Sequence, residues 1–258
     1  METPEGYVDT RLKLAVLATQ LLAVSAYAAE GAHHWSYSGE GAPNKWGGLE
    51  KEFASCGIGK TQSPIDIRTK DARVSDLPAL AFDYKPSALR IIDNGHTVQV
   101  NYAPGSSLTV DGTRYELLQF HFHKPSEERI DGKPFDMVAH LVHKDAQGHL
   151  AVVAVLLKAG AGNPVVASLW KNLPREKEKE VSVDSVTIDA TGLLPAARGY
   201  YTFQGSLTTP PCSEGVRWFV LKSPTTISTA EVAAFGKLYP KNARPVQPLN
   251  GREVQSTK

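Results

Sequence analysis

The sequence QFHFH at residues 119–123 places two histidines on a common face of one extended segment. It closes the stretch Tyr115–His123, which we expect to form a β-strand. Successive side chains of a strand point to opposite faces of the sheet, so His121 and His123 face one way and the two phenylalanines face the other. The pattern therefore predicts a strand with one apolar face and one face that carries a pair of imidazoles.

A third imidazole is available from the next β-type segment, Val138–His143, which contains His140 and His143. Because the spacing of these two is odd, only one of them can face the same side as the first pair. Asp131-Gly132-Lys133 between the segments indicates a turn, so the second strand can return antiparallel beside the first. Three neutral imidazoles with an open fourth position are typical of a catalytic zinc site. Structural histidines satisfied by other partners are the alternative at this point.

The rest of the chain consists mainly of short β-type segments separated by turn residues. Asn94-Gly95 and Asp111-Gly112 are hairpin signals. Leu150–Lys158 is nearly all apolar, as expected for a strand buried on both faces. No internal repeat or Pro/Ser-rich linker divides the chain, so we expect one sheet-centred domain. Gly31–Gly48 is expected as an ordered arm rather than a strand or helix. Helices are expected at Val165–Leu173 and Thr229–Leu238, and further strands at Ile91–Ile92, His96–Tyr102, Leu108–Val110 and Val216–Leu221.

The composition is that of an ordinary globular protein. Of 258 residues, 41% are hydrophobic and 21% charged, which allows a sizeable buried core. The formal net charge is +1, so the global charge gives no indication of a nucleic acid or an anionic membrane as partner. The mixed-charge segment Lys171–Glu180 is expected to be a solvated surface stretch.

The N-terminus has the parts of a secretory signal peptide. Arg11 and Lys13 precede an apolar run over Leu14–Val24, and Ala26-Tyr27-Ala28 offers small residues at a cleavage point. The run is too short to span a bilayer comfortably. We therefore predict a signal peptide at 1–28, a mature domain at 29–258, and a periplasmic or secreted protein with no membrane association after cleavage. An amphipathic first helix is the alternative, and acidic residues in the first nine positions are atypical of a signal peptide.

The chain has two cysteines, Cys56 and Cys212, which form the only possible intramolecular pair. Export to an oxidising compartment would permit a disulfide between them. Two buried free thiols are the alternative.

Around these residues the sequence closely resembles the alpha-class carbonic anhydrase family, bacterial branch. The resemblance is collinear from His34 to the end of the chain. It implies a mostly β (α+β) single domain around a large, twisted, mainly antiparallel sheet with a few short peripheral helices. The matching blocks are His34-Trp35-Ser36-Tyr37 with Trp46-Gly47, Gln62–Ile67, Asn94–Val98, Gln119–His123, Ala139–His143, Ser206–Cys212 and Arg244–Leu249.

The resemblance implies a zinc cofactor and assigns roles near it. His121, His123 and His140 are similar to the three zinc ligands, and Gln119 to the side chain that accepts the free N–H of His121. Thr208 resembles the hydroxyl that orients the nucleophile, and Glu127 the carboxylate that accepts the threonine proton.

The resemblance also assigns residues to substrate and proton transfer. Thr209 would line the bicarbonate site, and His96 occupies the proton-shuttle position, with a surface histidine as the alternative. The apolar wall that admits carbon dioxide would consist of Val142, Val152, Leu207 and Trp218, for which core packing is an equally compatible interpretation.

One position departs from the family pattern. For His140 the family usually places a glutamate two residues earlier, on the same strand face, where this chain has Val138. Valine cannot accept the imidazole N–H, so we expect weaker or faster-exchanging zinc and a modest loss of activity unless water or another side chain substitutes.

The function implied is reversible hydration of carbon dioxide to bicarbonate and a proton by attack of zinc-bound hydroxide, with these small molecules as the only partners besides a possible second copy in a homodimer. A zinc hydrolase acting on small esters is one alternative. A catalytically silent binding module is another, which the presence of all three zinc-type histidines disfavours.

Overall fold

The computed structural model describes residues 35–258, together with Met1. The predicted signal peptide at 1–28 thus lies outside the described residues, apart from Met1. None of the helices in the described part of the chain has the length and apolar character needed to cross a membrane.

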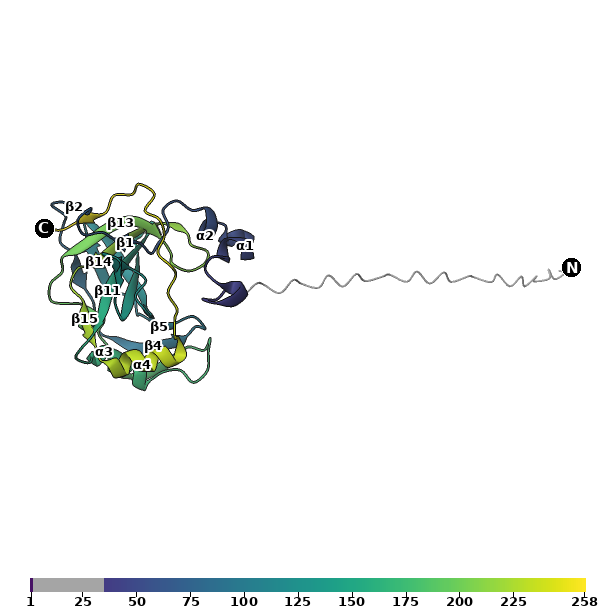
Figure 1. The fold of residues 1–258 in the computed structure, drawn as a ribbon. Coiled ribbons are helices and arrows are strands. Elements are labelled where there is room, and N and C mark those ends of the chain that lie inside the picture. Colours follow the sequence, from purple (N-terminus) through teal and green to yellow (C-terminus); the bar gives the residue numbers. More distant parts are fainter. Residues whose placement is uncertain (2–34) are drawn as a thin grey trace. The chain divides into compact units, whose positions relative to one another are not determined.

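A 13-stranded mixed sheet dominates residues 35–258 (Figure 1). Its main path runs β12-β4-β5-β7-β10-β11-β14-β13-β16-β2, while β6 pairs with β7 and β3, and β15 pairs with β11. Most pairs are antiparallel, and β11–β14, β11–β15 and β16–β2 are parallel. The predicted mostly β fold around a large, mainly antiparallel sheet is confirmed. The strands are β2 (Arg73–Val74), β3 (Ala81–Asp83), β4 (Ser87–Asp93), β5 (Val98–Asn101), β6 (Ser107–Val110), β7 (Thr113–His123), β10 (Met137–Lys144), β11 (Leu150–Ala159), β12 (Val181–Ile188), β13 (Tyr200–Ser206), β14 (Glu214–Leu221), β15 (Thr225–Ile227) and β16 (Gln255–Ser256).

A small second sheet and a few short helices complete the described fold. The order of the small sheet is β1-β8-β9, with β1 (Asp66–Ile67), β8 (Arg129–Ile130) and β9 (Lys133–Pro134). The helices are η1 (Gly39–Gly41), α1 (Trp46–Leu49), η2 (Lys51–Phe53), α2 (Ser55–Ile58), α3 (Pro164–Lys171), η3 (Ala190–Leu193) and α4 (Thr229–Leu238).

The two faces of the sheet centre pack into different clusters because side chains alternate along each strand. Phe120, Phe122 and Leu141 belong to the larger core. Val138 and Val142, which flank His140 at two-residue spacing, belong to the smaller cluster on the other face. His121, His123 and His140 therefore share a face with the smaller cluster, and the larger core packs against the opposite face of the two strands.

Helices α3 and α4 cover the larger core and lie side by side, with the Trp170 and Phe235 rings stacked 5.7 Å apart (Figure 1). Both begin with sequence-encoded caps. The Asn163 side chain accepts from the first free N–H groups of α3, and Ser228 forms a capping box with Glu231 at the start of α4. The two helices predicted from the sequence thus have the expected positions.

Two expectations for the N-terminal third need correction. The strand expected from His96 begins only at Val98, because the Asn94 side chain accepts the backbone N–H groups of His96 and Thr97 and holds them in a turn. The segment ending at Gly48 is not wholly an arm without regular structure, since it contains η1 and the start of α1.

Candidate metal centre

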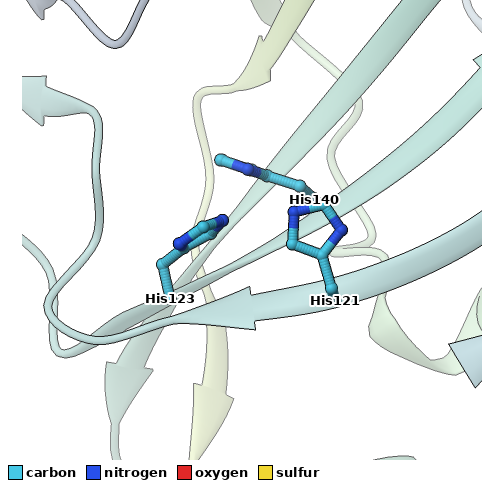
Figure 2. A group of neighbouring side chains, drawn as sticks. All are labelled: His121, His123 and His140. Atoms are coloured by element: carbon cyan, nitrogen blue, oxygen red, sulfur yellow. The ribbon is translucent and has the colours of Figure 1, made fainter. Parts of the chain in front are cut away.

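Strand pairing brings three histidines together. In the antiparallel pair β7–β10, His140 lies directly opposite His121, and Val138 lies opposite His123. Because His121 and His123 share one face of β7, all three imidazoles project to the same side of the sheet (Figure 2). One nitrogen from each ring can be chosen so that the three atoms lie within 4.8 Å of one another. These are nitrogens within reach of a single small cation.

The two imidazoles of β7 each bond an acceptor at Nδ1. The Nδ1 atom of His121 is 2.8 Å from Oε1 of Gln119, and that of His123 is 2.7 Å from the backbone oxygen of Asn242. Both acceptors lack a proton, so each ring must carry its hydrogen at Nδ1 and leave a lone pair at Nε2. The two Nε2 atoms are thereby prepared as ligands.

The third imidazole is held the opposite way round. Nε2 of His140 is 3.0 Å and 3.2 Å from the two oxygens of Glu128. A carboxylate accepts, so Nε2 carries the hydrogen and Nδ1 is left with the lone pair. The sequence had indicated no acceptor for His140 on its own strand, where Val138 stands, and the structure supplies one from outside the strand.

The donor set fits a zinc ion. Nε2 of His123 is buried without a hydrogen-bond partner, which is costly unless the atom has another function. Burial, followed by the proximity of His140, lowers the pKa of His121 to about 3, and the same causes lower the pKa of His123 well below its usual value. Neutral imidazoles are the form that binds metal, and three of them suit zinc with a fourth position open.

His140 differs in its electrostatics because of its carboxylate partner. Burial acts to lower its pKa, but the charge of Glu128 and the hydrogen bond to it outweigh this, and the pKa is raised. A cation at Nδ1 would therefore meet a ring whose opposite edge already faces a negative charge. That arrangement favours cation binding and fixes the ring orientation.

Glu127 lies beside the imidazoles, fully buried. Its Oε2 atom is 3.5 Å from Nε2 of His123 and 3.9 Å from Nδ1 of His140. Oε2 has no partner with full hydrogen-bond geometry, although the Thr208 side chain is close enough to lower the pKa of the carboxyl group. Burial is the larger effect and raises that pKa to about 7. A divalent cation nearby would favour the ionised form.

The four predicted apolar residues lie in or against one cluster next to His140. Val142, Val152 and Trp218 are buried in it, and Leu207 packs against it partly exposed. The Trp218 ring contacts the His140 ring edge to face with centroids 5.0 Å apart. The arrangement gives the histidine side of the sheet an apolar flank.

A cavity of about 120 Å³ opens beside the histidines. His121, His123, Thr209 and His96 are among the residues that line it. The His96 ring stacks on Trp35, with centroids 3.5 Å apart and planes 10° from parallel. An imidazole that is partly exposed thus shares the cavity with two of the three clustered histidines.

His143 lies on the other face of β10 and takes no part in the cluster. Its Nε2 atom is 2.7 Å from the Tyr84 hydroxyl, in the larger core. Burial lowers its pKa to about 4, so it is neutral at physiological pH. The odd spacing in the sequence predicted that only one of the two β10 histidines could join the pair on β7.

Cys56 and Cys212 form a disulfide, as predicted. The bridge is buried in a cluster with Trp46. Thr208 and Thr209 lie just before Cys212, and the N–H of Cys212 donates to the Thr209 backbone oxygen at 2.8 Å, so the bridge anchors the segment that carries both threonines. A disulfide of this kind indicates folding in an oxidising compartment.

Sequence reasoning missed three residues that hold the centre in place. Asn242 provides the acceptor for His123, Glu128 that for His140, and Arg244 an N–H for Glu127. The acidic pair Glu127-Glu128, four and five residues after His123, was the one available signal. The contacts of Asn242 with His123 and of Arg244 with Glu127 join segments more than 100 residues apart, so no local sequence pattern indicates them.

Comparison with known proteins found matches that cover most of the chain. The family model for eukaryotic-type carbonic anhydrase matches residues 41–258. A carbonic anhydrase of Nostoc sp. is 47% identical over 224 residues, covering 86% of this chain and 85% of the relative. That of Neisseria gonorrhoeae is 47% identical over 242 residues, covering 92% and 94%. The solved alpha-carbonic anhydrase of Thermovibrio ammonificans, in complex with the inhibitor sulfanilamide, is 44% identical with a TM-score of 0.84, over 88% of this chain and 100% of that one.

Proposed function

Since this chain belongs to the eukaryotic-type, or alpha, carbonic anhydrase family, we propose that it catalyses the reversible hydration of carbon dioxide to bicarbonate and a proton with a zinc ion held by His121, His123 and His140. The observation that carries the proposal is the cluster itself. Three imidazoles converge on one point, and an acceptor fixes the opposite nitrogen of each ring. Zinc in such a site acidifies a coordinated water so that it becomes a nucleophile near neutral pH, for which carbonic anhydrase is the reference case.

Thr208 and Glu127 orient the reacting water. A carboxylate can only accept, so the Thr208 hydroxyl must give its hydrogen to Glu127. The threonine oxygen is then left as an acceptor for the hydrogen of the reacting water. This directs the oxygen lone pair of that water toward the substrate carbon.

The surrounding side chains bind substrate and product. Carbon dioxide is linear and non-polar, and Val142, Val152, Leu207 and Trp218 provide an apolar flank next to His140. Thr209, which lines the cavity, offers a hydroxyl to the more polar bicarbonate.

His96 carries the proton away. Each hydration releases one proton, and an imidazole can take up and release protons near neutral pH. His96 lines the same cavity as His121 and His123 and is partly exposed, so it connects the centre to solvent.

We also propose that the protein acts in the periplasm or outside the cell. The disulfide supports this, because such bonds are rare in reducing compartments. N-terminal sequencing of the exported protein tests the cleavage predicted near Ala28. The possible homodimer stays a prediction, which sedimentation of the purified protein would test.

The deciding experiment measures carbon dioxide hydration by stopped flow before chelation, after zinc removal, and after zinc is restored. We expect activity to disappear with the metal and return with it. His140→Ala should lose bound zinc and activity, by more than the roughly 10- to 100-fold that the loss of an outer partner costs. His149→Ala, at an exposed loop histidine, serves as the control. Hydrolysis of a small ester without carbon dioxide hydration would support the hydrolase alternative, and stable zinc binding with neither activity would support a binding module.

A further inference from the structure

A buried carboxylate outside β10 is bonded to the outer edge of His140. Glu128 is fully buried, and both of its oxygens are within 3.2 Å of Nε2 of His140. No other hydrogen bond of its carboxylate occurs among residues 35–258. A buried charge is stable only with a partner, and here the partner is the imidazole.

The position that the family uses for this purpose cannot serve in this chain. Val138 is two residues from His140, on the same face of β10, and is fully buried. It packs in the smaller apolar cluster and has no group that can accept a hydrogen bond. The strand itself therefore leaves Nε2 of His140 without an acceptor.

The backbone around Glu128 is fixed on both sides. The Ser126 hydroxyl donates to the Glu128 backbone oxygen at 2.7 Å, and the N–H of Arg129 donates to the Ile65 oxygen at 3.3 Å. The next residues enter β8, which pairs with β1. The carboxylate is thus held by a rigid segment and need not be ordered when metal binds, which is what a positioning group requires.

We infer that Glu128 is the positioning residue of His140, and that the acceptor role has moved from position 138 on the strand to position 128 in the segment before β8. The inference rests on the proposed function, because it concerns a histidine assigned to zinc. It replaces the expectation of weakly held zinc that Val138 suggests. A carboxylate still contacts the His140 ring, but it belongs to residue 128 and not to residue 138.

The two interpretations of Val138 make opposite predictions for an added glutamate. If His140 lacks an acceptor, Val138→Glu alone should slow zinc release. If Glu128 already accepts the single N–H at Nε2, the added carboxylate has no hydrogen to bind and lies next to a like charge. Zinc release should then be no slower than in the natural chain.

The test is an exchange of the two residues, read out as the rate of zinc transfer to a chromophoric chelator. We expect Glu128→Gln, which keeps the shape and removes the charge, to release zinc on the order of 10- to 100-fold faster. Glu128→Gln with Val138→Glu should return most of the way to the natural rate. Glu128→Gln with Val138→Leu, which adds volume without an acceptor, should stay fast. The His140 Nε2–H resonance of the zinc-loaded protein should shift in Glu128→Gln, an effect that a merely structural role would not produce.

An unchanged release rate in Glu128→Gln would overturn the inference, as would slower release from Val138→Glu alone or failure of the double variant to restore retention. Any of these three outcomes would leave the proposed function intact as long as the natural chain binds zinc and hydrates carbon dioxide. A natural chain without zinc would instead contradict the proposed function. If Glu128→Gln does not fold, Glu128→Asp, one methylene shorter, gives the same comparison.

Discussion

The backbone N–H of Arg244 donates a 2.7 Å hydrogen bond to Oε1 of Glu127, both residues being buried. Oε1 is therefore occupied, and Oε2 lies beside the imidazoles of His123 and His140. The guanidinium of Arg244 in turn bonds Gln62, Ser63 and Cys56, so the segment that fixes Glu127 is itself fixed. Oε2 is the carboxylate oxygen left without a partner and thus available to accept a hydrogen from Thr208.

This geometry makes the Thr208 hydroxyl a separable part of the mechanism. Thr208→Ala should keep its zinc but lose on the order of 10²- to 10³-fold in kcat/KM, the usual cost of one preorganised hydrogen-bonding group. Thr208→Ser, which retains the hydroxyl, should recover most of the loss. Both are measured by stopped-flow hydration at matched zinc content. Equal activity of the alanine and natural proteins would show that Glu127 and Thr208 do not orient the reacting water.

The histidine cluster could be predicted because its geometry follows from local rules. Alternation on a strand decides that His121 and His123 share a face. The turn at Asp131-Gly132, where both residues have positive φ, reverses the chain within one short hairpin. The next strand then pairs back onto β7 and brings His140 opposite His121.

Gln119, two residues before His121 on the same strand, follows the same rule of alternation, but the acceptors for His123 and His140 follow no local rule. The oxygen that binds His123 is a backbone carbonyl at Asn242, and every residue has one, so its sequence carries no signal. Glu128 meets His140 only because the segment before β8 folds over the face of β10. A strand pattern considered alone leaves His140 without a partner, and the fold supplies one from a side chain outside the strand.

The disulfide contributes mainly to the stability of the fold. Cys56 and Cys212 are separated by 156 residues, so the bond closes a very long loop of the unfolded chain. In the chain-entropy view its loss costs up to about 5 kcal/mol in the free energy of unfolding. We expect Cys56→Ser with Cys212→Ser to unfold at clearly lower denaturant concentration while the folded fraction still binds zinc. A midpoint equal to that of the natural protein would contradict this expectation.

His143 should make stability depend on pH. Burial lowers its folded pKa to about 4, whereas an unfolded histidine has a pKa of about 6.5. Between these values the unfolded state holds a proton that the folded state excludes, so stability is complete above pH 6.5 and is lost as the pH falls. The loss is at most about 1.4 kcal/mol per pH unit.

The test compares how steeply the free energy of unfolding falls with pH in the natural chain and in His143→Gln. The other buried histidines contribute equally to both proteins. His143→Gln should show a shallower fall in the free energy of unfolding between pH 6.5 and 4 than the natural chain, whatever its absolute stability. Identical slopes would mean that His143 takes up its proton in the folded state as readily as in the unfolded one.

His96 provides the sharpest kinetic test of the proposed proton path. Addition to carbon dioxide needs no proton transfer to solvent, whereas regeneration of the reactive water does. His96→Ala should therefore lower kcat on the order of 100-fold in weak buffer and leave kcat/KM nearly unchanged. Imidazole added to the buffer should restore kcat, because it can replace the missing ring in the cavity that His96 and His121 line. If kcat and kcat/KM fell together, or kcat did not change, His96 would be acting through its stacking on Trp35 and not as the proton carrier.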